Sequence, residues 1–96
     1  MATYIGLMKL TEQGVKSIKE TPGRVEANRK RMQEQGIEIK SWFLTMGRYD
    51  VVTVVEAPSD EAIVKAVLTI AGQGNVRTET LRAYSLEETK KIVAGL

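Results

Sequence analysis

The clearest hydrophobic pattern lies in the middle of the chain, where two apolar segments flank a short polar connection. Residues 37–46 and 51–57 are rich in β-branched and aromatic residues, which favour strands. Residues 47–50, Gly-Arg-Tyr-Asp, lie between them and have the composition of a turn. This pattern predicts a β-hairpin. Because Val51–Val55 is almost wholly apolar, we expect its strand to be central in a sheet and buried on both faces.

The segment before the hairpin predicts one strand and one interrupted helix. Tyr4–Leu10 has strand composition, and Thr11 follows it as a suitable N-cap. Apolar residues then recur at helical spacing over residues 12–35. We expect this helix to break near Pro22, with Thr21 as the cap of its second part.

The segment after the hairpin predicts helix, strand and helix. Ser59 is the expected N-cap of a helix that Gly72 ends as its C-terminal cap. Residues 75–84 alternate as a fourth strand, whose charged residues favour an edge position. Ser85 and Glu88 form a capping box at the start of a short last helix.

The predicted order is β-α-β-β-α-β with a C-terminal helix, in a single domain spanning residues 1–96. Right-handed crossovers around a hairpin give an α+β, ferredoxin-like antiparallel sheet with strand order 4-1-3-2 and helices on one face. The other face would then be uncovered, although Trp42, Phe43 and Leu44 indicate apolar side chains on both sides. The sequence therefore predicts a homodimer, or a higher homo-oligomer, with the sheets face to face.

Composition excludes several classes of site. The chain has no cysteine and no histidine, so disulfides, thiolate nucleophiles and the usual zinc or haem ligands are absent. No cluster of acidic residues indicates an oxygen-ligated ion, and we expect neither metal nor cofactor. No signal peptide or membrane-spanning run is recognisable, so a cytoplasmic protein is the expectation.

Three motifs carry a resemblance to a known family. Residues 10–14 (Leu-Thr-Glu-Gln-Gly), 47–50 (Gly-Arg-Tyr-Asp) and 74–83 (Gly-Asn-Val-Arg-Thr-Glu-Thr-Leu-Arg-Ala) occur in this order. The chain resembles the GYD domain family, small bacterial and archaeal proteins named after their Gly-x-Tyr-Asp stretch. The resemblance covers about Thr3 to Tyr84 and implies a ferredoxin-like fold of the dimeric α+β barrel type. It implies no known activity.

The Gly-Arg-Tyr-Asp stretch admits two interpretations. In the first it is turn chemistry, with Gly47 at positive φ and Asp50 bonding local amides. In the second, Tyr49 is a hydrogen-bond donor or general acid that Asp50 orients. The sequence alone leaves both open.

The glycines around residue 73 are not a phosphate loop, because they follow a helix instead of preceding one. Asn75 and Arg77 in the next strand could still bind an anion over the open sheet face. An ion pair between Arg77 and Glu79, two residues apart on one face, explains them equally well.

Nucleic-acid binding is disfavoured. The element order is that of the RRM, and residues 24–31 carry several basic side chains. However, an RRM stacks bases on aromatic residues of its third strand, and Val51–Val55 contains none. The formal charge of only +2 adds no general attraction to polyanions.

Two function classes remain. The first is a small-ligand or partner-binding module that uses the open sheet face of a dimer. The second is a cofactor-independent enzyme that uses Tyr49, Asp50 and Arg77 at the same interface. The candidate ligand-binding residues combine an aromatic wall with a few polar groups; they are Tyr4, Trp42, Met46, Tyr49, Asp50, Asn75 and Arg77.

Overall fold

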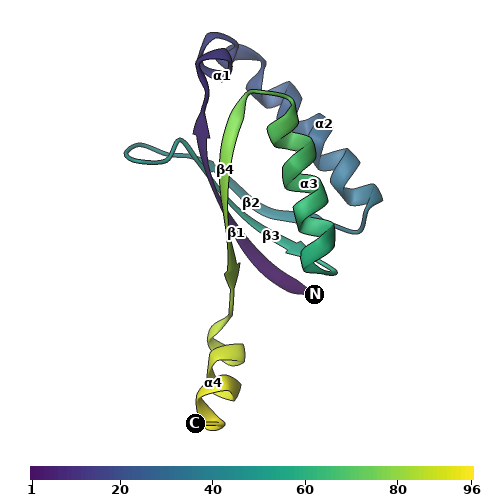
Figure 1. The fold of residues 1–96 in the computed structure, drawn as a ribbon, viewed down its shortest axis with the longest axis vertical. Helices are drawn as coiled ribbons and strands as arrows, with labels where there is room; N and C mark the ends of the chain where they lie inside the picture. The colour runs from purple at the N-terminus through teal and green to yellow at the C-terminus, as the bar shows by residue number, and fades with distance from the viewer.

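Four antiparallel strands form one sheet in the computed structural model, which describes residues 1–96. The strands are β1 (Ala2–Leu10), β2 (Glu38–Leu44), β3 (Val51–Ala57) and β4 (Val76–Ala83). Their order is β2-β3-β1-β4, which is the predicted order, and β4 is at an edge as expected (Figure 1).

The helices follow the predicted pattern, with a break before Pro22. The first part consists of α1 (Glu12–Lys16) and a 3₁₀ turn, η1 (Ile18–Glu20); α2 (Thr21–Glu34) follows. The prediction that Thr21 caps α2 is wrong, because η1 runs directly into α2 and makes Thr21 its first residue. Helix α3 (Asp60–Gly72) lies beside α2 on one face of the sheet (Figure 1).

The hydrophobic core lies between this sheet face and the two helices. Its largest fully buried side chain is Ile37, which lies in the connection between α2 and β2. The other core residues come from β1, α2, β3 and α3; they are Tyr4, Met32, Val55, Ala57, Ile63 and Ala66. Burial alternates along β3, where Val51, Thr53, Val55 and Ala57 are buried and the residues between them are half-buried. The prediction that β3 is buried on both faces is therefore wrong for the single chain, because helices cover only one face.

The turns use glycine where the backbone needs a positive φ. Gly47 has φ 103° in the β2–β3 connection, as the turn interpretation predicts. Between α3 and β4 the prediction of Gly72 as the cap is wrong, since α3 extends through Gly72 and Gly74 is the residue with positive φ, at 83°. No positive φ is therefore needed at Gly72.

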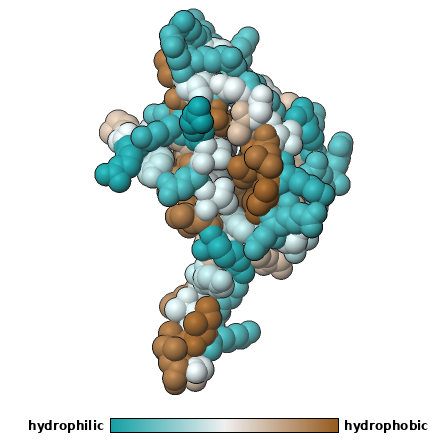
Figure 2. Space-filling model, viewed as in Figure 1, coloured by the Kyte–Doolittle hydropathy of each residue, from teal (hydrophilic) through white to brown (hydrophobic).

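The last helix, α4 (Leu86–Ala94), extends away from the sheet and its covering helices (Figure 1). Its capping box is formed as predicted: Ser85 Oγ accepts from the Glu88 N–H at 3.1 Å, and a Glu88 carboxylate oxygen accepts from the Ser85 N–H at 3.0 Å. Hydrophobic residues gather on it, and Leu86, Ile92, Val93 and Leu96 are all exposed (Figure 2).

Candidate functional site

The sheet face opposite the helices is apolar and uncovered. Directly paired residues of antiparallel strands share a face, so the pairs Ile5–Val54, Ile5–Leu81, Leu7–Val52 and Phe43–Val52 define one surface across all four strands. We call these six residues (Ile5, Leu7, Phe43, Val52, Val54 and Leu81) the open face. Phe43 is 58% exposed and Leu81 is 42% exposed. This surface is the uncovered apolar face that the sequence predicts.

Charged residues lie at the two ends of the open face. Lys9 pairs with Arg77 at one end, beyond Leu7, and Glu79 stands opposite Leu7 on the neighbouring strand. Glu38 pairs with Glu56 at the other end. One end is therefore mainly basic and the other mainly acidic.

The Gly-Arg-Tyr-Asp stretch lies at the basic end, but Tyr49 and Asp50 form their hydrogen bonds with other residues and not with each other. Asp50 Oδ2 accepts a hydrogen bond from the Leu10 backbone N–H at 2.9 Å. The Tyr49 hydroxyl donates instead to Glu79 at 2.6 Å, and Lys9 Nζ lies 6.0 Å from the Tyr49 ring centroid. Asp50 thus anchors the hairpin to β1. The prediction that it bonds local amides of the turn is wrong, because its partner Leu10 lies on another strand.

The chain has three tyrosines. We expect Tyr49→Phe to remove one that ionises at higher pH than an ordinary tyrosine. The hydrogen bond to Glu79 raises the pKa of Tyr49 above its ordinary 10.0, because ionisation would break this bond and place two anions together. Since the pKa is higher in the folded state than in the unfolded state, the hydrogen bond stabilises the fold below pH 10 and its contribution disappears as the pH rises through the folded pKa.

Tyrosinate absorbance measured against pH checks this assignment. The variant should lose amplitude only in the late part of the curve, and the stability difference from the unmodified chain should shrink above about pH 10. Tyr4 serves as an internal reference, because its hydrogen bond to Asp60 also raises its pKa. Loss of an early-ionising tyrosine would show that the Tyr49–Glu79 bond does not form.

The seven candidate ligand-binding residues do not converge on one site. Tyr4 is a core residue that donates its hydroxyl to Asp60. Trp42 and Asn75 line a cavity between the sheet and the helices, on the side away from the open face. Met46 is 98% exposed in the β2–β3 connection. Tyr49 reaches Glu79, a neighbour of Arg77 in β4, and these residues belong to the open-face side.

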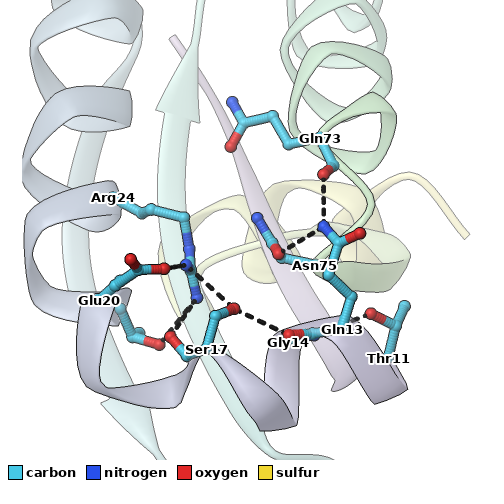
Figure 3. A network of polar contacts seen from close by, with 9 residues as sticks. Thr11, Gln13, Gly14, Ser17, Glu20, Arg24, Gln73 and Asn75 are labelled. Atoms are coloured by element: carbon cyan, nitrogen blue, oxygen red, sulfur yellow. Dashed lines mark hydrogen bonds and ion pairs between the residues drawn. The ribbon is translucent and has the colours of Figure 1, made fainter.

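A polar network joins two of the sequence motifs that are about sixty residues apart (Figure 3). Gln13 Nε2 donates to the Gln73 carbonyl oxygen at 3.0 Å and to Asn75 Oδ1 at 2.9 Å. Thr11 Oγ1 donates to the Gly74 carbonyl oxygen at 2.6 Å, and the Thr11 N–H donates to the Asn75 carbonyl oxygen at 3.0 Å. The network fixes α1 against the α3–β4 turn. Sequence reasoning missed it, although both of its halves lie in or beside the motifs that carry the family resemblance.

Two classes of structure are absent. Nowhere do three or more carboxylate side chains gather as a metal site would require. No helix has the length and hydrophobicity needed to cross a lipid bilayer.

Comparison with family models gives a match to the GYD domain over residues 4–93. The chain is also 34% identical, over 89 residues, to a Thermus thermophilus protein described as "Glutamine synthetase and cystathionine beta-lyase binding protein". That alignment covers 92% of this chain and 94% of the Thermus protein.

Two solved structures share the fold. The crystal structure of TTHA0845 from Thermus thermophilus superposes with a TM-score of 0.57 at 25% identity, covering 88% of this chain and 95% of that one. The crystal structure of FFRP-DM1 gives a TM-score of 0.55 at 18% identity, covering 88% of this chain and all of the other. At 18% identity the second likeness concerns the fold alone.

Proposed function

The chain belongs to the GYD domain family, and we propose that it is a protein-binding module that pairs with a second copy of itself through the open face. In this dimer the two sheets pack face to face as a dimeric α+β barrel. The paired chains then present the surface to which partner enzymes bind.

The observation that carries the proposal is the uncovered open face. A sheet four strands wide and about seven residues long covers roughly 450 Å² in projection, from ordinary strand spacing and rise. Six apolar side chains occupy this surface. These side chains form one apolar patch between the charged ends of the face, and the largest apolar patch of a soluble protein is often a binding site. A second copy of the chain would cover this face, so no further segment of the chain is needed to remove it from water.

The charges at the two ends favour a particular arrangement of the pair. A two-fold axis perpendicular to the strands brings the basic end of one open face over the acidic end of the other. Lys9, on β1 of one copy, then comes closest to Glu56 of the second, on β3, the strand next to β1. Such rim charges select orientation more than they add affinity.

The description of the Thermus relative supports the proposal that this chain binds other proteins. Its description names two enzymes that it binds, glutamine synthetase and cystathionine beta-lyase, and its alignment with this chain spans nearly all of both proteins. We therefore take the corresponding two enzymes of the genome that encodes this chain as the first partners to test.

The test is interferometry with the immobilised chain and each purified enzyme. We expect at least one enzyme to bind reversibly. We also expect Phe43→Glu to weaken capture, because a single chain loses the second contact that a two-fold dimer makes with an oligomeric enzyme. Leu68→Glu, a matched change at a 66% exposed position on α3, is the control variant for the open face.

Binding of neither enzyme, with a properly folded chain on the sensor, would contradict the proposed partners. Equal binding by Phe43→Glu and the unmodified chain would contradict the role of the open face. The two parts of the proposal therefore fail separately.

A further inference from the structure

A cavity of about 90 Å³ lies between the sheet and the helices, on the face opposite the open face. Ten of its 16 lining residues are hydrophobic, and they come from β1, β2, β3, β4, α2 and α3. Trp42 of β2 forms part of the wall. A space of this size corresponds to about three water molecules, each of which needs polar partners that apolar walls do not supply. An apolar group of suitable size would therefore fill this space favourably, because it would contact apolar walls instead of water.

The polar groups of the cavity are concentrated among a few side chains. Arg24 is the only charged residue in the lining, and Asn28, Gln73 and Asn75 accompany it. Figure 3 shows Arg24 extending from α2, and Gln73 and Asn75 from the end of α3 and the turn after it, toward the space between the two helices. The cavity thus has a cationic, amide-lined part and an apolar remainder.

Hydrogen bonds hold the Arg24 guanidinium in place, but its only anionic partner is an exposed carboxylate. Its guanidinium donates to Ser17 Oγ at 3.3 Å, to the Ser17 carbonyl oxygen at 3.2 Å and to Thr21 Oγ1 at 3.2 Å. These acceptors are uncharged. The one carboxylate nearby, Glu20, is 3.4 Å away and 73% exposed, so solvent screens it. The contacts to Ser17 Oγ and to Glu20 are longer than 3.2 Å, which leaves part of the guanidinium able to take a better acceptor.

The neighbouring amides also offer donors. Asn75 Oδ1 accepts from Gln13, and Asn28 Oδ1 accepts from Gln73 Nε2 at 3.1 Å. In both asparagines the carbonyl oxygen is used within the protein, while the NH₂ group has no partner in the chain. A cation and two unused amide donors at one part of an apolar cavity are complementary to a small anion with an apolar body.

We propose that this cavity binds a short-chain carboxylic acid of two or three carbons, with its carboxylate at Arg24 and its short apolar tail against the apolar wall that includes Trp42. This site is separate from the protein-binding role of the open face. It makes the chain responsive to a small anionic metabolite as well as to protein partners.

The test uses the fluorescence of Trp42, the single tryptophan of the chain. The probes are acetate and propanoate, each compared with its neutral alcohol, ethanol and propan-1-ol. We expect both acids to shift the emission saturably, and to bind at least about tenfold more tightly than the alcohols, as a charge-assisted hydrogen bond predicts.

Two variants locate the site. Arg24→Gln should remove the preference for the acids, whereas Lys30→Gln, an exposed cation on the same helix, should not. Val25→Phe fills the cavity and should abolish the response to acids and alcohols alike while keeping Arg24. This second variant decides the matter if Arg24→Gln does not fold.

Equal affinity for acids and alcohols would overturn the carboxylate assignment. A saturable response that survives Val25→Phe, or no response of Trp42 to either acid, would overturn the site itself. None of these outcomes affects the open-face proposal, because the open face is on the other side of the sheet.

Discussion

Phe43→Glu is expected to separate the proposed dimer into single chains. Phe43 is 58% exposed in one chain, so the substitution costs the isolated fold about 1 kcal/mol or less. In a face-to-face dimer the two-fold axis places two glutamates in the apolar interface. Each buried, unpaired charge costs about 3–5 kcal/mol, which raises the dissociation constant by a factor of at least about 10³.

Sedimentation velocity measures this change, because the dimer has twice the 10.6 kDa mass of the chain. Leu68→Glu introduces the same charge at an exposed leucine of α3 and should leave the mass unchanged. If Leu68→Glu dissociates the dimer and Phe43→Glu does not, the interface is formed by the helices and not by the open face.

Gly14→Ala is expected to destabilise the protein more than any exposed substitution. Gly14 is buried in α1, and a Cβ built there lies 2.1 Å from the Asn75 carbonyl oxygen. That oxygen belongs to the backbone and accepts the Thr11 N–H, so it cannot move without breaking the network of Figure 3. We expect a loss of about 3 kcal/mol in the free energy of unfolding, the upper range for overpacking.

The matched control is Gly23→Ala. Gly23 lies in α2 with nothing within 4 Å of the added Cβ, so alanine should stabilise the chain by about 0.5–1 kcal/mol. Urea unfolding of the two variants compares these effects directly. Equal stabilities would mean that α1 is not held against the α3–β4 turn.

The local signals in the sequence specify most of the fold. The bounds of β3 are those predicted, and the N-caps at Thr11, Ser59 and Ser85 all form. Each of these features depends on residues within one turn or one strand. The strand order then follows from the right-handedness of the crossovers, which is a general rule of such folds.

The orientation of Trp42 could not be predicted by simple alternation. The pairing of β2 with β3 shifts between Ile39 and Ser41, so Lys40 is an extra residue in the ladder. Because of this bulge Ile39 and Trp42, three residues apart, both point toward the helices. Trp42, a candidate for the open face, therefore lies on the helix-covered face, and Phe43 lies on the open face.

The contacts around Asn75 cannot be predicted from the sequence either. Asn75 was a candidate for the open face, but it bonds Gln13 beside the helix-covered cavity. Nothing in the composition of residues 10–14 or 74–83 indicates that they touch, since the contact depends on where α1 and the α3–β4 turn end in space. Arg24 and Gln73 were missed as cavity residues for the same reason.

The contact between two open faces can be measured directly by isotope-filtered NMR on a mixture of ¹³C-labelled and unlabelled chains. We predict intermolecular NOEs among the methyl groups of Ile5, Leu7, Val52 and Val54. A spectrum without such NOEs, from a protein that tumbles as a single 10.6 kDa chain at millimolar concentration, would contradict the pairing of open faces.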